Sequence, residues 1–174
     1  RGLGDVYKRQ GDERPGLVAA GDGETYMMPV EVCESRYPIL VERYAFAVNG
    51  RGSGKFRGGF GIVKDYRILR EGCFVSATFG RHRFPPWGAA GGEDGSPNGV
   101  AVVRDGKTLL WKGKLARFPL EKGDVVRLVT GTGGGFGSPS ERDPALVRED
   151  ARNGFCPPER AREAFGVKHD PQGG

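Results

Sequence analysis

The sequence predicts a mainly β protein of the α+β class, with antiparallel strands and hairpins, a short N-terminal helix and a C-terminal helical pair. Between residues 40 and 130, short runs of β-branched and aromatic residues alternate with Gly, Pro, Asn and Asp, which is typical of strands joined by turns. The chain holds 31 glycines in 174 residues without a collagen-like period, which indicates many turns and close backbone approaches. After residue 142, apolar residues recur at helical spacing instead.

The first expected element is a helix over residues 29–36, because Pro29 suits a first helical turn and Tyr37-Pro38 ends it. Strands are expected next at 40–48, 60–69 and 73–79. The short turn 70–72 between the last two strands predicts that they pair as a hairpin.

The later strands are predicted from their turns. Asp105-Gly106, within GVAVVRDGKTLLW, is a strong two-residue hairpin signal. Residues 115–130 contain two more short strand signals, separated by Lys122-Gly123-Asp124. Irregular loops are expected at 49–59, 91–98 and 131–139, where glycine dominates.

Two helices are expected at the C-terminal end. Asp143-Pro144 is typical of a helix start and Asn153-Gly154 of a helix end. Pro157-Pro158 opens the second helix, and Gly166 ends it. Each helix has one small apolar face, so we expect the pair to pack together on the β body.

Composition and charge narrow the class of protein. The net charge of +5 permits nucleic-acid binding without requiring it, since acidic residues are interspersed along the chain. No apolar run approaches the ~20 residues that span a bilayer, so no membrane is expected. Three widely spaced cysteines argue against a disulfide framework and indicate a reducing, cytoplasmic location.

Two glycine-rich stretches resemble nucleotide-binding motifs, and both depart from them. GRGSGKF, residues 50–56, has Asn49 where a P-loop begins with glycine, and Phe56 where the magnesium-holding Ser or Thr belongs. GTGGGFGSP has Phe136 at the third glycine of the dinucleotide fingerprint and no βαβ unit around it. Both are better interpreted as loops in which backbone approaches backbone.

Metal and cysteine chemistry find little support in the residues. With two histidines, His82 and His169, no set of three or four convergent ligands is apparent by spacing, so no metal is expected in this chain. Cys33 and Cys73 lie in apolar runs and are expected to be core residues, while Cys156 has no histidine near it in the sequence.

RHRFPPWGAAGG, residues 81–92, is the segment with the strongest recognition chemistry. Pro85-Pro86 stiffens the backbone, Trp87 offers a large flat face, and Arg81 offers a fork for a carboxylate or phosphate. The residues alone favour a recognition loop and a structural turn equally. Arg81 and His82 are candidates for a catalytic role, without an assigned step.

Five sequence blocks together resemble the C-terminal part of the hydantoinase B / 5-oxoprolinase family. In order they are PVEVCESRYPILVERY, GKFRGGFGIVKDYR, RHRFPPWGAAGG, LEKGDVVRLVTGTGGGFGSPSERDP and a closing helical pair ending in FGV. The family includes the B-type subunits of ATP-dependent N-methylhydantoinases, the C-terminal half of 5-oxoprolinase, and subunits of acetone and acetophenone carboxylases.

The resemblance implies an enzyme that works in two parts. A hydantoinase A-type subunit or domain binds ATP and phosphorylates the substrate, and the B-type chain completes hydrolysis of a hydantoin-like or 5-oxoproline-like ring in a hetero-oligomer. Any divalent metal belongs to an N-terminal part missing here, so this chain is expected to be a fragment that is inactive alone. The expected substrate or interface loops contain Arg57, Gly58, Gly59, Arg81, Pro85, Pro86, Trp87, Gly88, Gly91, Gly92, Gly133, Gly134 and Gly135.

The resemblance also sets the expected domain organisation. Residues 1–10, RGLGDVYKRQ, resemble an adapter-derived peptide from translated environmental reads and are set aside. Loop 11–25, the mainly β domain 26–142, the helical pair 143–167 and the polar tail 168–174 follow.

Two alternative functions stay open at this point. One is an ATP-dependent ketone carboxylase subunit of the same family. The other is a basic nucleic-acid-binding β domain, because arginines, lysines and aromatics interleave between residues 51 and 83. No RNP, KH or zinc signature accompanies that pattern, so nucleic acid is not the expected partner.

Overall fold

The computed structural model describes residues 28–48 and 51–166 as a mainly antiparallel β protein with three α-helices, which confirms the predicted class. In chain order the elements are α2 (Val30–Arg36), β1 (Ile39–Ala47), β2 (Gly61–Ile68), β3 (Cys73–Thr78), β4 (Gly99–Arg104), β5 (Lys107–Lys112), β6 (Lys114–Leu120), β7 (Val125–Val129), α3 (Pro144–Arg152) and α4 (Pro158–Phe165). A 3-10 turn at Pro139–Glu141 precedes α3. The expectations for segments 1–10, 11–25 and 168–174 lie outside the described residues.

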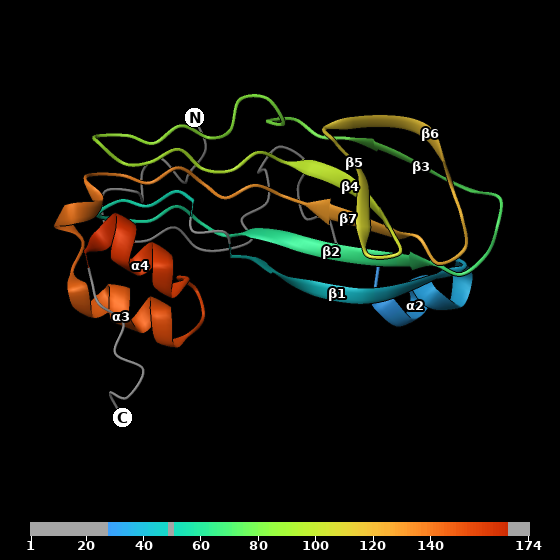
Figure 1. The fold of residues 1–174 in the computed structure, drawn as a ribbon, viewed down its shortest axis with the longest axis horizontal. Helices are drawn as coiled ribbons and strands as arrows, with labels where there is room; N and C mark the ends of the chain where they lie inside the picture. Colours follow the sequence, from blue (N-terminus) through green and yellow to red (C-terminus); the bar gives the residue numbers. More distant parts are fainter. Residues whose placement is uncertain (1–27, 49–50, 167–174) are drawn as a thin grey trace.

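A five-stranded antiparallel sheet, in the order β1-β2-β7-β4-β5, forms the body of the molecule (Figure 1). The predicted hairpin at Asp105-Gly106 is confirmed, since Arg104 pairs with Lys107 across that turn. Both turn residues have positive φ, as this tight turn requires. In the β1–β2 pair the register shifts between Val41 and Arg43.

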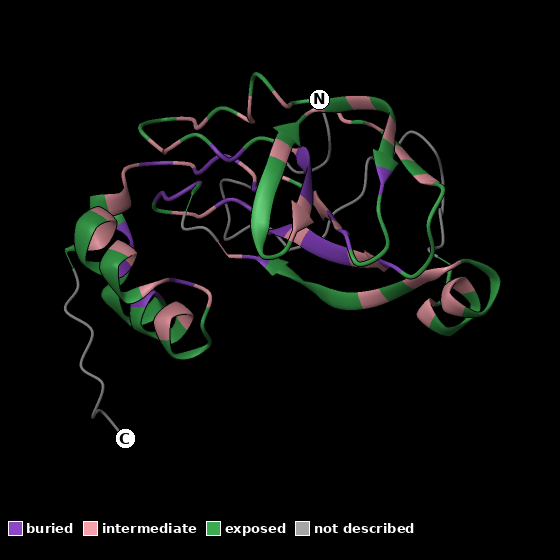
Figure 2. Cartoon of the chain, turned by 45° about the vertical axis from the view of Figure 1, so that its right-hand side comes forward, coloured by how far each residue is buried: buried purple, intermediate pink, exposed green. Residues whose placement is uncertain are grey.

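Strands β3 and β6 form a separate two-stranded sheet that packs against one face of the larger one. The buried core residues between them are Ile68, Val100, Val102, Leu120 and Val126. Burial is greatest along β4 and the middle of the five-stranded sheet, while β1 and β5 are largely exposed (Figure 2). Cys73 packs against this core as predicted, whereas Cys33 is only half-buried on α2, a helix without a buried residue.

The predicted hairpin between strands 60–69 and 73–79 is wrong. Both edges of β2 are already hydrogen-bonded, one to β1 and the other to β7. The turn after Ile68 therefore carries the chain into the second sheet, where β3 pairs with β6. A short turn predicts a hairpin only when the first strand has a free edge, and the sequence of the turn does not contain that information.

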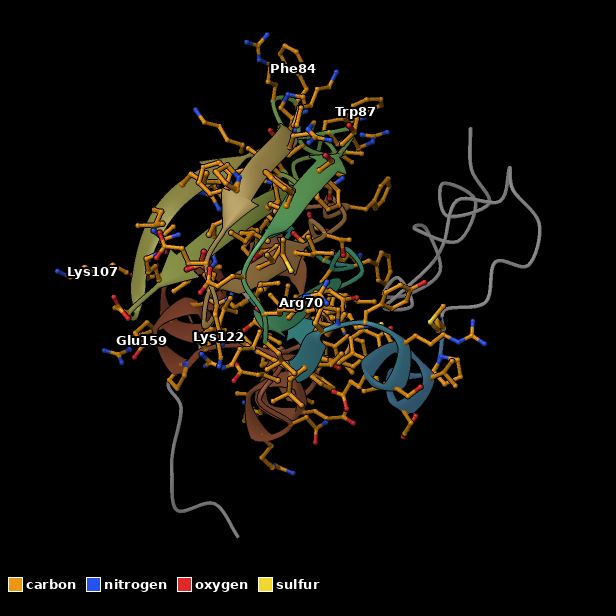
Figure 3. The ribbon with its side chains drawn as sticks, turned by 90° about the vertical axis from the view of Figure 1, so that its right-hand side faces the viewer. Arg70, Phe84, Trp87, Lys107, Lys122 and Glu159 are labelled. Carbon is orange, nitrogen blue, oxygen red and sulfur yellow. The ribbon has the colours of Figure 1, made fainter. Side chains whose placement is uncertain are left out.

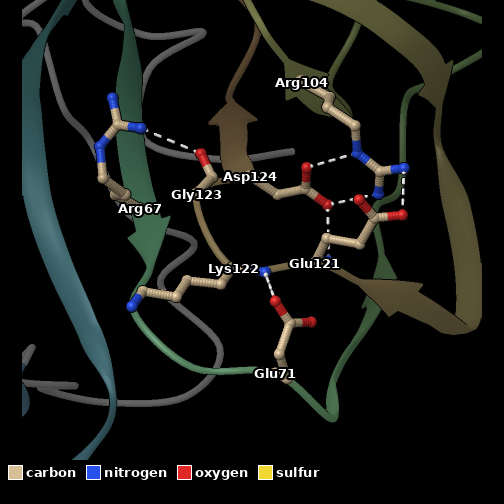
Figure 4. A network of polar contacts seen from close by, with 7 residues as sticks. All are labelled: Arg67, Glu71, Arg104, Glu121, Lys122, Gly123 and Asp124. Atoms are coloured by element: carbon tan, nitrogen blue, oxygen red, sulfur yellow. Dashed lines mark hydrogen bonds and ion pairs between the residues drawn. The ribbon is translucent and has the colours of Figure 1, made fainter.

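A buried carboxylate fixes the turn between β6 and β7 (Figure 4). Asp124, 1% exposed, accepts hydrogen bonds at 2.8 Å from Nε and Nη2 of Arg104 on β4. It also accepts one from the backbone N–H of Glu121 at 2.9 Å. The Arg104 guanidinium lowers the pKa of the Asp124 carboxyl, so the pair stays ionised and joins the turn to the end of β4.

The C-terminal helices have the predicted termini. The Asp143 side chain accepts a hydrogen bond from the N–H of Ala145 at 2.8 Å, which caps α3. Gly166 adopts a left-handed conformation at the end of α4. Val147 and Ala161, each 1% exposed, are buried between the two helices with Cys156. The pair lies at the opposite end of the molecule from α2 (Figure 1).

Candidate functional site

Three glycine-rich segments far apart in the sequence run side by side between the strands and the C-terminal helices (Figure 1). We call these segments, residues 52–59, 88–96 and 131–137, the glycine layer. Phe56 and Phe136 exchange backbone hydrogen bonds of 3.0 and 2.9 Å. The N–H of Ala89 donates to the Gly135 carbonyl at 2.9 Å, so the third segment joins the same backbone network.

The glycines of this layer are needed because the backbones touch one another. A Cβ on Gly58 would lie less than 3.0 Å from the carbonyl group of Gly133, and one on Gly92 equally close to the carbonyl of Gly135. Gly134 has the same relation to the Trp87 carbonyl. Any side chain at these positions would force two backbone segments apart, which explains the glycine content that the sequence shows.

Several backbone amides of the layer donate to carbonyl groups of the layer itself. Gly133 donates its N–H to Gly59 at 2.9 Å, Gly135 donates to Glu93 at 2.9 Å, and Lys55 donates to Gly137 at 3.2 Å. A phosphate-binding loop instead points its N–H groups at the ligand. The rejection of the P-loop and dinucleotide interpretations, made from motif spacing, therefore has a structural basis at these amides.

An arginine cluster joins the glycine layer to the helical pair. The Arg142 side chain, 1% exposed, donates to the carbonyl of Lys55 at 3.2 Å and to Asp150 Oδ2 at 2.8 Å. Arg57, one of the expected site residues, donates from Nε to the same carboxylate oxygen at 3.2 Å and lies 4.3 Å above the Phe60 ring. Asp150 on α3 is therefore shared by two arginines from outside its helix.

A shallow open pocket lies beside this cluster and is lined by Arg51, Glu93, Asp94 and Arg160. Arg160 on α4 bonds the carboxylate of Glu93 and also lies 3.3 Å from the Ser53 hydroxyl. Cations and carboxylates meet here in equal number, so the pocket suits a polar ligand bearing both donors and acceptors.

Cys156 lies close by, and burial raises the pKa of its thiol. The side chain is therefore a protonated, buried thiol at neutral pH. This gives no support to a cysteine nucleophile, in line with the interpretation from the sequence.

Residues 81–87, the first part of the predicted segment 81–92, lie along one side of the molecule, with Phe84 and Trp87 projecting outward (Figure 3). Trp87 is 71% exposed and Phe84 is 81% exposed. Because the Trp87 ring is exposed, it does not fix the loop by packing into the core. Its base is closed by Asn98, whose N–H donates to the Arg81 carbonyl at 3.3 Å and whose side chain donates to the Gly80 carbonyl at 2.8 Å.

The side chains of Arg81 and His82 make different contacts within that loop. The Arg81 guanidinium carbon lies 5.8 Å from the centre of the Trp87 ring, and its backbone has a positive φ of 48°. His82 Nδ1 is 2.9 Å from the Phe79 carbonyl oxygen, and its half-buried ring packs directly on Gly113. Both contacts of His82 are with the backbone of neighbouring segments, and Arg81 and Arg83 are the exposed cations of the loop.

The predicted site residues therefore divide into two groups. Arg57, Gly58, Gly59, Gly88, Gly92, Gly133, Gly134 and Gly135 lie together in the glycine layer or on its border. Arg81, Pro85, Pro86 and Trp87 form the projecting loop. Gly91, exposed and with a φ of 89°, belongs to the 88–96 segment of the glycine layer. The sequence did not point to Arg142 or Asp150, because two charged residues in a helical region look like solvated surface.

Within the described part of the chain, no three His, Cys, Asp or Glu side chains lie close enough to hold a metal ion. No helix in residues 28–48 and 51–166 is long and apolar enough to cross a membrane.

The fold and the glycine layer define the chain as an α+β domain whose distant blocks pack backbone to backbone. The chain belongs to the Hydantoinase B/oxoprolinase family, whose model matches residues 4–139. The resemblance drawn from the five sequence blocks is thereby confirmed.

The chain is similar to one part of several longer proteins. It is 36% identical over 142 residues to the B-type subunit of a putative D-/L-hydantoinase of Pseudomonas sp. (strain NS671), and the match covers 80% of this chain and 24% of that protein. The ATP-dependent caprolactamase structure from Pseudomonas jessenii superposes with a TM-score of 0.71 at 31% identity, over 84% of this chain and 26% of that one.

An acetone carboxylase in its nucleotide-free structure shares the fold, with a TM-score of 0.75 at 20% identity over 90% of this chain and 25% of that one. The chain thus spans about a quarter of the length of each of these proteins.

Proposed function

We propose that this chain is the C-terminal part of the B-type subunit of an ATP-dependent cyclic amidohydrolase. The complete enzyme opens hydantoin-like or 5-oxoproline-like rings together with an ATP-binding A-type partner, in the cytoplasm. The observation that carries the proposal is family membership over residues 4–139, joined to a glycine layer built from the same blocks that carry the resemblance.

The geometry supports an enzyme in which the A-type partner binds ATP and this domain does not. Lys55 and Phe56 of one glycine-rich motif, and Gly133 and Gly135 of the other, donate their backbone N–H groups inside the layer, so these amides are not directed at a phosphate. ATP is then bound by the partner, and the similar caprolactamase and acetone carboxylase are both ATP-dependent enzymes. The hydantoinase relative is itself one subunit of an enzyme, which supports a hetero-oligomer.

The projecting loop is proposed as an interface loop of that assembly. Phe84 and Trp87 are large and exposed, and Asn98 closes the base of their loop with a backbone and a side-chain hydrogen bond, so docking them orders little additional chain. Buried aromatic anchors with a neighbouring arginine dominate many protein interfaces. Arg81, against the Trp87 ring, supplies such a cation.

A substrate panel tests the proposed function. The full-length B-type protein and the A-type protein encoded with it are purified together and incubated with ATP and either hydantoin, 5-oxoproline or caprolactam, or with acetone and bicarbonate. Ring opening of a cyclic amide is the expected result. Carboxylation of acetone without any ring opening would instead assign the protein to the ketone carboxylase alternative.

A further inference from the structure

Lys64 is a buried lysine in the middle of β2. The residue is 8% exposed, and its ammonium nitrogen lies 4.9 Å from the centre of the Tyr44 ring and 5.2 Å from that of Tyr66. Tyr44 is its direct partner in β1, and Tyr66 is two residues along the same strand, so all three share one face of the sheet. Leu128 of β7 is opposite Lys64 on the other side.

The carboxylates of the two strands, Asp65 on β2 and Glu42 on β1, are engaged elsewhere. Asp65 points to the opposite face of the sheet, where both its oxygens accept hydrogen bonds from Arg127 at 2.8 Å. Glu42 on β1 is paired with Arg67. Among the described residues, the Lys64 ammonium contacts two aromatic rings and forms no ion pair. The N–H groups of this ammonium are therefore available to a carboxylate supplied by a ligand.

An apolar pocket adjoins Lys64 on this face. Its lining is Tyr44, Ala45, Phe46 and Ile62, and its volume is about 440 Å³. Ile62 precedes Lys64 by two residues on β2 and is opposite Phe46 in β1, so the pocket continues the row of side chains that contains Lys64. Tyr44 belongs to both features, since it lines the pocket and lies against the ammonium.

We propose that Lys64 is the anchor of a binding site for a small organic carboxylate. The carboxylate pairs with the ammonium between Tyr44 and Tyr66, and the apolar body of the ligand lies on Phe46 and Ile62. The site is on the opposite side of β1–β2 from the Asp65–Arg127 pair. It is independent of the proposed function, because binding to the chain alone requires neither ATP nor a partner.

A titration followed by NMR tests this site on the 174-residue chain. Hexanoate is added while the amide signals of Tyr44, Phe46 and Ile62 are recorded, with acetate, hexanamide and inorganic phosphate as comparison ligands. We expect saturable shifts with hexanoate, and dissociation constants at least about tenfold weaker for acetate and hexanamide, because each lacks one of the two interactions. Phosphate is expected to bind as weakly as acetate, since it has no apolar body.

Lys64→Met keeps the length and apolar stem of the side chain and removes the charge. It should weaken hexanoate binding by about tenfold or more, a loss typical of one ion pair in a partly buried site. Lys107→Met, at the exposed first residue of β5, is the matched control and should bind hexanoate like the wild type (Figure 3). Equal hexanoate affinity in the Lys64→Met and wild-type chains would overturn the site, as would equal affinity for hexanamide and hexanoate. The comparison of ligands on the wild type stands even if Lys64→Met does not fold.

Discussion

A Cβ atom placed on Gly58 would lie 2.9 Å from the Cα of Gly133 and even closer to the carbonyl group of that residue. These two glycines belong to blocks that lie far apart in the sequence, yet their backbones are in direct contact. The same relation recurs between Gly92 and Gly135. The glycine layer is therefore a packing device, and its glycines are required by neighbours rather than by turns alone.

Gly58→Ala should destabilise the chain by about 2 kcal/mol, since overpacking against a backbone forces two segments apart. Gly80→Ala is the matched control, because a Cβ there meets nothing within 4 Å. The free energies of unfolding from urea denaturation give the comparison. Equal free energies of unfolding for Gly58→Ala and Gly80→Ala would contradict the tight backbone packing of Gly58 against Gly133.

Asp124 should contribute stability that depends on pH. Hydrogen bonds from Arg104 lower its pKa in the folded state, so its contribution is fully present above the unfolded-state pKa near 4 and is lost as the pH falls through the lower folded-state value. Asp124→Asn should therefore cost about 1–3 kcal/mol at pH 7 and progressively less below about pH 4. Glu163→Gln on exposed α4 serves as the control. A cost for Asp124→Asn that stays constant down to about pH 2 would contradict the ionised pair.

Arg142→Met should loosen the helical pair from the glycine layer. Its side chain is 1% exposed and bonds both Lys55 and Asp150, so truncation leaves a carboxylate with one partner fewer in a buried place. Breaking such a pair typically costs about 3 kcal/mol. Arg148→Met, at an exposed position of α3, should change stability by less than about 0.5 kcal/mol. Faster proteolytic release of residues 143–166 from Arg142→Met than from Arg148→Met is the expected observation.

Trp87→Ala should leave the isolated chain as stable as the wild type, because the ring is 71% exposed. In the assembled enzyme the same change should weaken the association of the two proteins, and Arg81→Lys should do so more mildly since lysine lacks the planar fork. Leu109→Ala, at an exposed apolar residue of β5, is the control for general loss of surface area. Sedimentation of the complex measures association. Unchanged association in both loop variants would make the loop a structural turn only.

The sequence predicts the local elements well and the long-range pairing poorly. Capping at Asp143, the left-handed Gly166 and the Asp105-Gly106 hairpin depend on a few neighbouring residues, so pattern alone identifies them. The partner of β3 depends on which strand edges are already occupied, and that is decided by strands far along the chain.

In the candidate site, too, the sequence predicts local features but not which distant residues come together. Glycine content indicated close approaches, but the identity of the neighbours, such as Gly133 for Gly58, emerges only in the fold. The burial of Lys64 could not be anticipated, because one lysine among several basic residues between 51 and 83 resembles any other on a solvated strand.

The most direct test of the central claim is the coupling of ATP consumption to ring opening. The full-length B-type protein, its A-type partner and the two together are each incubated with ATP and 5-oxoproline or hydantoin, and ADP and ring-opened product are both quantified. The account predicts that product forms only with both proteins and in step with ADP. Ring opening by the B-type protein alone, or in the absence of ATP, would contradict it.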